Sequence, residues 1–205
     1  MNRALVAVEK NSITAYVPEY LSCINAQAFM DCKVLTAISA NESLSIGPSA
    51  FYNCISLNKI VGDKSNRLEP YHISGAVNDA VFYNCSSLID IKLLSSVQSI
   101  GASAFYNCRS IDDLHDDATI AMKNYWSLSS LGDHAFEKCS SLKSFDIPKA
   151  ISSFGDDVFK DCPSLMNVNI DLNIEDFAEL VGYAKVEDAI IGKFASINEG
   201  TPNYG

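Results

Sequence analysis

The stretch FYNC occurs three times in the chain, at Phe51–Cys54, Phe82–Cys85 and Phe105–Cys108. Extending the pattern to every Phe-x-x-Cys gives six copies, which begin at Phe29, Phe51, Phe82, Phe105, Phe136 and Phe159. Successive copies are therefore 22, 31, 23, 31 and 23 residues apart. A period near 23 residues, with two longer copies, is typical of a solenoid built from stacked coils.

Further columns repeat in the same register. Leu or Ile lies three positions after each Cys, and the stretch Ser141–Pro148 alternates apolar and polar residues, which predicts a half-buried strand. Each copy would stack its Phe, Leu and Ile on its neighbours to form one continuous core. Gly or Asn lies four positions before each Phe, at Asn25, Gly47, Asn78, Gly101, Gly132 and Gly155. Because both residue types tolerate positive φ, we expect each copy to turn sharply there.

The unit L-x-x-I-x-I-P…I-G-x-x-A-F-x-x-C-x-S-L resembles the BspA-like leucine-rich repeats, most closely in Lys92–Ile111 and Ser144–Leu165. The resemblance covers about Ile13 to Ile170. It implies an α/β repeat solenoid of short strands and turns over residues 1–172. The sequence departs from the pattern where about eight residues are inserted, in Gly62–Ser74 and in Asp116–Ser127.

The repeat pattern ends near Asn173. Residues 173–205 contain helical spacing at Phe177, Leu180 and Val181, preceded by the acidic pair Glu175 and Asp176, which suits the first turn of a helix. A second short helix is predicted over Val186–Phe194. We expect this segment to form a helical C-terminal cap over the last coil. The alternative is a linker or docking helix toward a further region.

Composition excludes some function classes. A formal net charge of −10 without any basic patch argues against nucleic-acid binding. The apolar runs are too short to span a bilayer, which needs about 20 residues. No signal-peptide apolar core fits at the N-terminus. Two explanations are open: the protein is cytosolic, or an export signal has been removed.

The cysteines and histidines offer little chemistry. Neighbouring coils lie about 4.8 Å apart, which permits disulfides, but parallel side chains in a core need none. The family resemblance implies buried free thiols in the column, and leaves Cys23 as the thiol that reacts if it is exposed. Metal-site spacing and an activated Cys–His pair are absent, so we expect no enzyme activity, no cofactor and no metal. Asp113, Asp116 and Asp117 form either a weak divalent-cation site or, as we favour, a solvated loop.

Two surfaces are candidates for partner binding. In leucine-rich repeats the outward strand positions form the concave face, where an extended polar surface suits a protein or peptide better than a small substrate. The predicted binding residues are the strand positions Lys59, Asp90, Lys92, Asp113, His115, Asp146 and Asn169 and the insert aromatics Tyr71, Tyr125 and Trp126. Trp126 could instead be a lid packed over the coil edge. The residues after three of the phenylalanines, Tyr52, Tyr83 and Tyr106, form either an exposed aromatic stripe or a cover for the coil edge.

The resemblance implies a function in binding. It implies adhesion to host or matrix proteins such as fibronectin, at the cell surface or after secretion, and we expect the chain to be a monomer. The alternative is a cytoplasmic protein–protein interaction scaffold, which unpaired thiols would favour.

Overall fold

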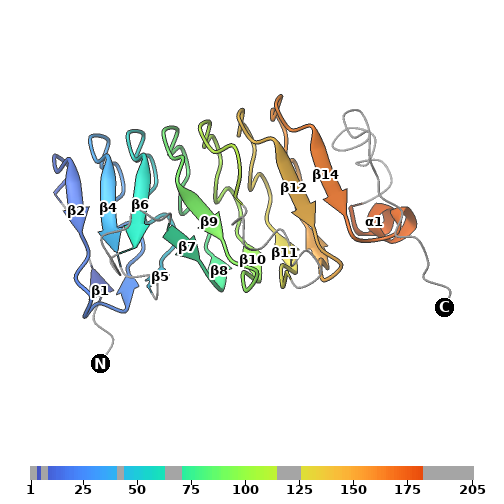
Figure 1. Cartoon of the computed structure of the whole chain (residues 1–205), viewed down its shortest axis with the longest axis horizontal. Helices are drawn as coiled ribbons and strands as arrows, with labels where there is room; N and C mark the ends of the chain where they lie inside the picture. The colour runs from blue at the N-terminus through green and yellow to red at the C-terminus, as the bar shows by residue number, and fades with distance from the viewer. Residues whose placement is uncertain (1–3, 6–8, 41–43, 63–70, 115–125, 182–205) are drawn as a thin grey trace.

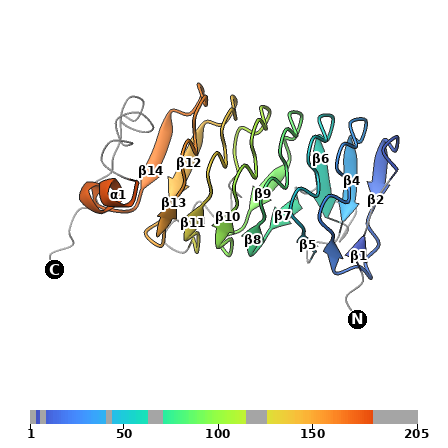
Figure 2. The same ribbon diagram turned by 180° about the vertical axis from the view of Figure 1, so that it is seen from behind.

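The protein is an elongated stack of coils, seen from its two sides in Figures 1 and 2. The computed structural model describes residues 4–5, 9–40, 44–62, 71–114 and 126–181. The predicted repeat solenoid is confirmed. Within the described residues its coils consist of strands and turns, and the single helix follows the repeats. The repeats therefore form a β-solenoid, without the helices that an α/β class implies.

The strands lie in two lines along the stack, and every strand pairing described is parallel. Within the described part of the chain, hydrogen bonding divides the first line into three sheets and the second into two, and residues 111–114 form no strand. The first line, which we call the long-strand sheet, contains β2 (Thr14–Tyr16), β4 (Ala37–Ala40), β6 (Lys59–Gly62), β7 (Tyr71–Ile73), β9 (Ile91–Leu93), β12 (Ser144–Ile147) and β14 (Asn167–Ile170). The second line contains β1 (Ala4–Leu5), β3 (Cys23–Ile24), β5 (Ser45–Ile46), β8 (Ala76–Val77), β10 (Ser99–Ile100), β11 (Ser130–Leu131) and β13 (Ser153–Phe154).

The repeated phenylalanines form the centre of the core. The rings of Phe29, Phe51, Phe82, Phe105, Phe136 and Phe159 stack in one row, with successive centroids 5.0 to 5.6 Å apart. All six side chains are buried. Burial of one such side chain stabilises the fold by about 1.5–3 kcal/mol, so this column is a major source of stability.

The repeated cysteines hold neighbouring coils together through hydrogen bonds. From the second coil onward, each column thiol donates from Sγ to the carbonyl oxygen of the phenylalanine one coil earlier, over 2.9 to 3.1 Å. All seven cysteines of the chain are free, as expected for an unbridged ladder. The Cys side chain is small enough for the tight slot and polar enough to satisfy a buried carbonyl group.

The expected sharp turn at the Gly or Asn column is wrong. The left-handed residues instead lie two positions before and two positions after each phenylalanine, for example Ser103 (φ 54°) and Asn107 (φ 59°) around Phe105. The glycines are required by close approach between coils. A Cβ added at Gly132 would lie 2.4 Å from the backbone nitrogen of Ala102, and one at Gly155 would lie 2.4 Å from that of Asp133.

The first insertion changes the stacking. After β6 the chain returns as β7, which pairs with β9 and lies between β6 and β9 (Figure 1). β5 and β8, which would otherwise be neighbours, belong to separate sheets. A pocket of about 270 Å³ opens there, lined mainly by apolar side chains that include Ile46, Val77 and Phe82. Asn78 occupies the column position that is glycine at Gly47, Gly101, Gly132 and Gly155. Its side-chain amide donates to the carbonyl oxygen of Ile46 at 2.6 Å.

The chain ends its described part in the helix α1 (Ile174–Val181). Asn173 caps this helix, because its side-chain oxygen accepts the backbone N–H of Asp176 at 2.8 Å. Phe177 is buried and contacts the ring of Phe154 edge-on, at 5.6 Å between centroids. The predicted second helix, Val186–Phe194, lies outside the described residues, so the complete helical cap over 173–205 stays a prediction. No helix among the described residues is long and apolar enough to cross a membrane.

Candidate functional site

The outward-facing side chains of the long-strand sheet form a polar surface, which we call the sheet face. Along β4, β9, β12 and β14, residues alternate between buried and more exposed positions. Six of the predicted residues lie on the sheet face with partly or fully exposed side chains. Lys59, Lys92, Asp146 and Asn169 lie in strands, Asp90 forms an isolated bridge with Lys59, and Asp113 lies in residues 111–114, which form no strand.

Several charges on the sheet face already have partners. Lys92 Nζ lies 3.8 Å from Asp113 Oδ2 and donates to the Asp113 carbonyl oxygen at 3.1 Å. Asn169 donates from its side-chain amide to the carboxylate of Asp146. These links run between coils, so they hold the polar groups in a fixed pattern.

The structure does not describe the side chains of three predicted residues, Tyr71, His115 and Tyr125. His115 and Tyr125 lie outside the described residues, as do Asp116 and Asp117 of the suggested cation site. The backbone register pairs Tyr71 with Ile91 and the neighbouring His72 with Lys92. His72 is therefore the neighbour of Lys92 on the sheet face. The repeat pattern does not predict this position, because β7 belongs to an insertion.

The sheet face also includes Tyr16, which the sequence analysis did not propose. Its side chain is 57% exposed, and β2 pairs it with Ser39, which in turn pairs with Val61. The repeat alignment contained the signal: Val17 aligns with Ile147, so Tyr16 occupies the same column as Asp146. Its large ring gives the N-terminal end of the face an aromatic anchor.

The predicted tyrosine stripe is a continuous stack. The rings of Tyr52, Tyr83 and Tyr106 are nearly parallel, with centroids 4.5 and 4.6 Å apart. All three side chains are half-buried, and burial is the main reason why the pKa of Tyr83 is raised. The ammonium group of Lys138 contacts the Tyr106 hydroxyl and lies 4.8 Å from its ring centroid, a cation–π contact.

An asparagine ladder runs beside the tyrosine stripe. Asn107 donates to Asn84, Asn84 donates to Asn53, and Asn53 donates to Asp31, all between side chains over 2.5 to 2.7 Å. Ladder and stripe together cover the backbone at this edge of the coils. Each ring is partly accessible, so the choice between an exposed stripe and a cover for the coil edge stays a prediction.

Trp126 lies against the core. Its side chain is partly buried, and its ring is 5.4 Å from that of Phe145. This packing agrees with the lid alternative from the sequence.

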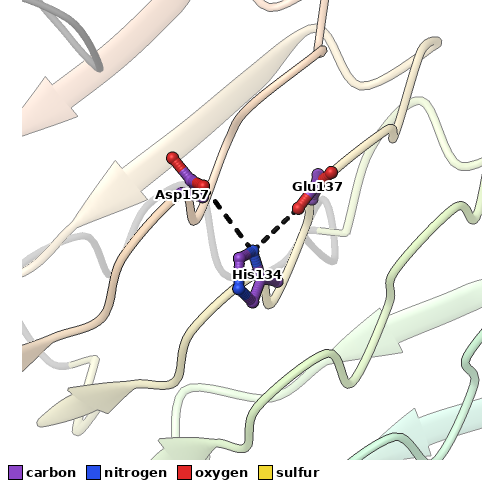
Figure 3. Close-up of side chains that lie close together, drawn as sticks. All are labelled: His134, Glu137 and Asp157. Atoms are coloured by element: carbon purple, nitrogen blue, oxygen red, sulfur yellow. Dashed lines mark hydrogen bonds and ion pairs between the residues drawn. The ribbon is translucent and has the colours of Figure 1, made fainter.

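A cluster of titratable side chains lies where the tyrosine stripe ends. His134, Glu137 and Asp157 point toward one another from two neighbouring coils (Figure 3). His134 Nδ1 lies 2.8 Å from Glu137 Oε2 and 3.9 Å from Asp157 Oδ2. No spacing along the chain indicates this cluster, because Asp157 becomes a neighbour of His134 and Glu137 only when the coils stack. Comparison of columns could have found it, since His134 and Asp157 occupy the same repeat position.

The sequence matches the family model described as BspA type leucine-rich repeat region, in six copies, over residues 8–120 and 74–181. No curated protein matches the sequence.

Three solved structures are similar to the protein. A leucine-rich repeat protein from Bacteroides ovatus is 29% identical with a TM-score of 0.61, and the match covers 80% of this chain and 38% of that one. A leucine-rich cell surface protein from Faecalibacterium prausnitzii is 21% identical with a TM-score of 0.58, over 80% and 48% of the two chains. The T. pallidum leucine-rich repeat protein is 24% identical with a TM-score of 0.60, over 80% and 71%. The protein thus spans less than half the length of the first two.

Proposed function

The chain belongs to the BspA-type leucine-rich repeat family, and we propose that it is a non-catalytic module that binds a host or matrix protein at the cell surface or outside the cell. The partner would lie along the sheet face, and the module would act as a monomer. Leucine-rich repeats are interaction modules, so a protein partner follows from the family. Adhesion is the more specific part of the proposal.

The sheet face is the observation that carries the proposal. It presents a row of ordered polar and charged groups along successive coils, with the exposed ring of Tyr16 at one end. A polar surface that extends over successive coils suits a protein or an extended peptide. The apolar pocket between β5 and β8 is lined by none of the six predicted residues on the sheet face.

The location is supported by one similar protein. The Faecalibacterium prausnitzii structure is described as that of a cell surface protein. Its identity of 21% supports a shared fold, so the location of our protein stays part of the proposal.

Binding to a panel of extracellular-matrix proteins, at physiological salt, tests the proposal. A variant with Asp90→Lys, Asp113→Lys and Asp146→Lys reverses charges on the sheet face. The matched control carries Glu9→Lys, Glu19→Lys and Glu179→Lys, which are exposed positions outside the sheet strands with the same total change in charge. We expect saturable binding that the first variant loses by at least tenfold and the control retains. Equal loss in both variants would reject the sheet face as the binding surface.

The alternative is an intracellular interaction scaffold. One observation favours it: all seven thiols are free, which is usual in reducing compartments. Absence of binding to every matrix protein at micromolar concentration, together with binding to a protein from the source cell through the same aspartates, would support this alternative.

A further inference from the structure

The cluster of His134, Glu137 and Asp157 is built by the repeat itself. His134 and Asp157 lie two positions before Phe136 and Phe159, and both have left-handed backbones, with φ of 58° and 55°. Their coils are hydrogen-bonded through the His134 N–H and the Asp156 carbonyl oxygen at 2.8 Å. Stacked coils place equivalent residues about 4.8 Å apart, so the two side chains are held next to each other.

Glu137 is the buried member of the cluster. Its side chain is only 10% exposed, and its backbone N–H donates to the His134 carbonyl oxygen at 3.1 Å. Its own carbonyl oxygen accepts the N–H of Asn107 from the preceding coil at 2.8 Å. These bonds fix the main chain of Glu137, and its largely buried carboxylate contacts the imidazole at 2.8 Å.

We propose that His134, Glu137 and Asp157 form a binding site for a divalent transition-metal ion of the Zn²⁺ type. One ligand atom from each residue lies within 4.8 Å of the other two. Ligand atoms about 2.0–2.1 Å from a tetrahedral Zn²⁺ lie roughly 3.3 Å from one another. The distances of 2.8 and 3.9 Å from His134 Nδ1 fall on either side of that value, and the two carboxylate oxygens lie within 4.8 Å of each other. Changes in these separations of at most about 1.5 Å would therefore give the tetrahedral spacing.

The ligand types select the class of metal. One imidazole and two carboxylates suit Zn²⁺ and its neighbours, whereas Ca²⁺ and Mg²⁺ require shells made almost entirely of oxygen. Three protein ligands leave a fourth position for water, because His134 and Asp157 reach the surface with side chains that are both 43% exposed.

Two lysines now neutralise the carboxylates. Lys138 Nζ lies 3.3 Å from Glu137 Oε1, and Lys160 Nζ lies 2.9 Å from Asp157 Oδ2. Both lysine side chains are largely accessible, so they can move into water when a metal ion takes over the neutralisation. Lys138 also contacts Tyr106, and metal binding would therefore alter the end of the tyrosine stripe.

The test is titration of untagged protein with Co²⁺, followed by visible absorption, and with Zn²⁺, followed by calorimetry. The background carries Cys23→Ser, which removes the half-exposed thiol. The variants are His134→Asn, Glu137→Gln and Asp157→Asn, and Asn is well tolerated at the two left-handed positions. His72→Asn, on the sheet face, is the matched control.

We expect one ion per chain, with at least tenfold weaker binding in each cluster variant and unchanged binding in the control. Melting temperatures measured without metal show whether each variant is folded, and Zn²⁺ should raise the melting temperature of the background protein only where the cluster is intact. Absence of saturable binding up to millimolar Zn²⁺, or binding that the three substitutions leave unchanged, would overturn the proposal and leave the cluster a hydrogen-bonded network.

Discussion

At the scale of single residues, the repeated Cys has two roles in one position. Its small side chain is buried in the core, and its thiol donates to a carbonyl oxygen of the coil before it, as Cys108 does to Phe82 at 3.0 Å. Burial raises the pKa of the Cys54 thiol to about 12 and raises the pKa of Cys85, Cys108 and Cys139 well above its ordinary value. These thiols stay protonated in the folded protein at any physiological pH.

The buried thiols predict a loss of stability in alkaline solution. In the unfolded chain each thiol ionises with a pKa of about 8.5, whereas the folded state keeps it protonated. Their contribution is thus complete below that pH and is lost as pH rises toward the folded pKa. Each thiol should lower the free energy of unfolding by about 1.4 kcal/mol per pH unit above pH 9. Urea unfolding under reducing conditions at pH 7, 9 and 10 measures this slope.

Two variants distinguish the contribution of the buried thiols from that of other groups that titrate in alkaline solution. Cys108→Ala should remove the contribution of one thiol to the pH dependence of the unfolding free energy. At pH 7 it should lower that free energy by about 1–3 kcal/mol, because a hydrogen bond and packing are lost. Cys23→Ser, at a half-exposed position outside the column, is the control for removal of a thiol. An unfolding free energy that stays constant from pH 8 to pH 10 would contradict the assignment of these thiols to the core.

At the scale of the coil, close approach between neighbours decides which residue each position accepts. Gly101, Gly132 and Gly155 lie where the backbone of the preceding coil leaves no space for a Cβ. Asn78 occupies the same column at the gap next to β7, where its side chain bonds Ile46 across the opening. In these coils, glycine in this column marks direct contact with the preceding coil, and Asn78 marks the gap.

Substitution of these glycines tests the close approach. Gly132→Ala should destabilise the protein by about 3 kcal/mol or more, because its Cβ would overlap backbone atoms that cannot move singly. Gly75→Ala is the control: it has open space but a φ of +76°, so it should cost only about 1–2 kcal/mol. Thermal unfolding of both variants gives the comparison. Equal losses would mean that backbone conformation, and not contact between coils, requires glycine at 132.

Much of the coil could be predicted from the sequence, and the failures have physical reasons. The Phe, Leu and Cys columns were correct because identical coils must bury identical positions. The turn at Gly132 was wrong because glycine serves both positive φ and close packing, and the sequence does not distinguish the two. The pairing of β7 with β9 was missed because an insertion has no repeat with which to align. The cluster around His134 was missed because its residues are neighbours across coils.

At the scale of the whole molecule, the solenoid is a row of units in which each coil contacts only the next. Its stability is then a sum of local terms, and the ends are the weakest parts. The helix α1 packs against the last coil through Phe177, which is 1% exposed. This contact supports the proposal that the C-terminal segment closes the open end of the core.

Loss of that contact should loosen the C-terminal end only. Phe177→Ala should cost about 3–5 kcal/mol. It should increase hydrogen exchange in β13 and β14 and leave β3 and β5 unchanged. Glu179→Ala, an exposed change on the same helix, should alter stability by less than about 0.5 kcal/mol. Uniformly faster exchange along the whole solenoid would show a single cooperative unit and contradict the additive description.

The proposed function depends on which surface a partner covers. Hydroxyl-radical footprinting of the complex, read by mass spectrometry, reports this directly for side chains of different surfaces. We predict that partner binding lowers the oxidation of Tyr16 and His72 on the sheet face, and leaves the exposed Tyr20 and Met166 unchanged. Protection confined to Tyr52, Tyr83 and Tyr106 would instead place the partner on the tyrosine stripe and contradict binding through the sheet face.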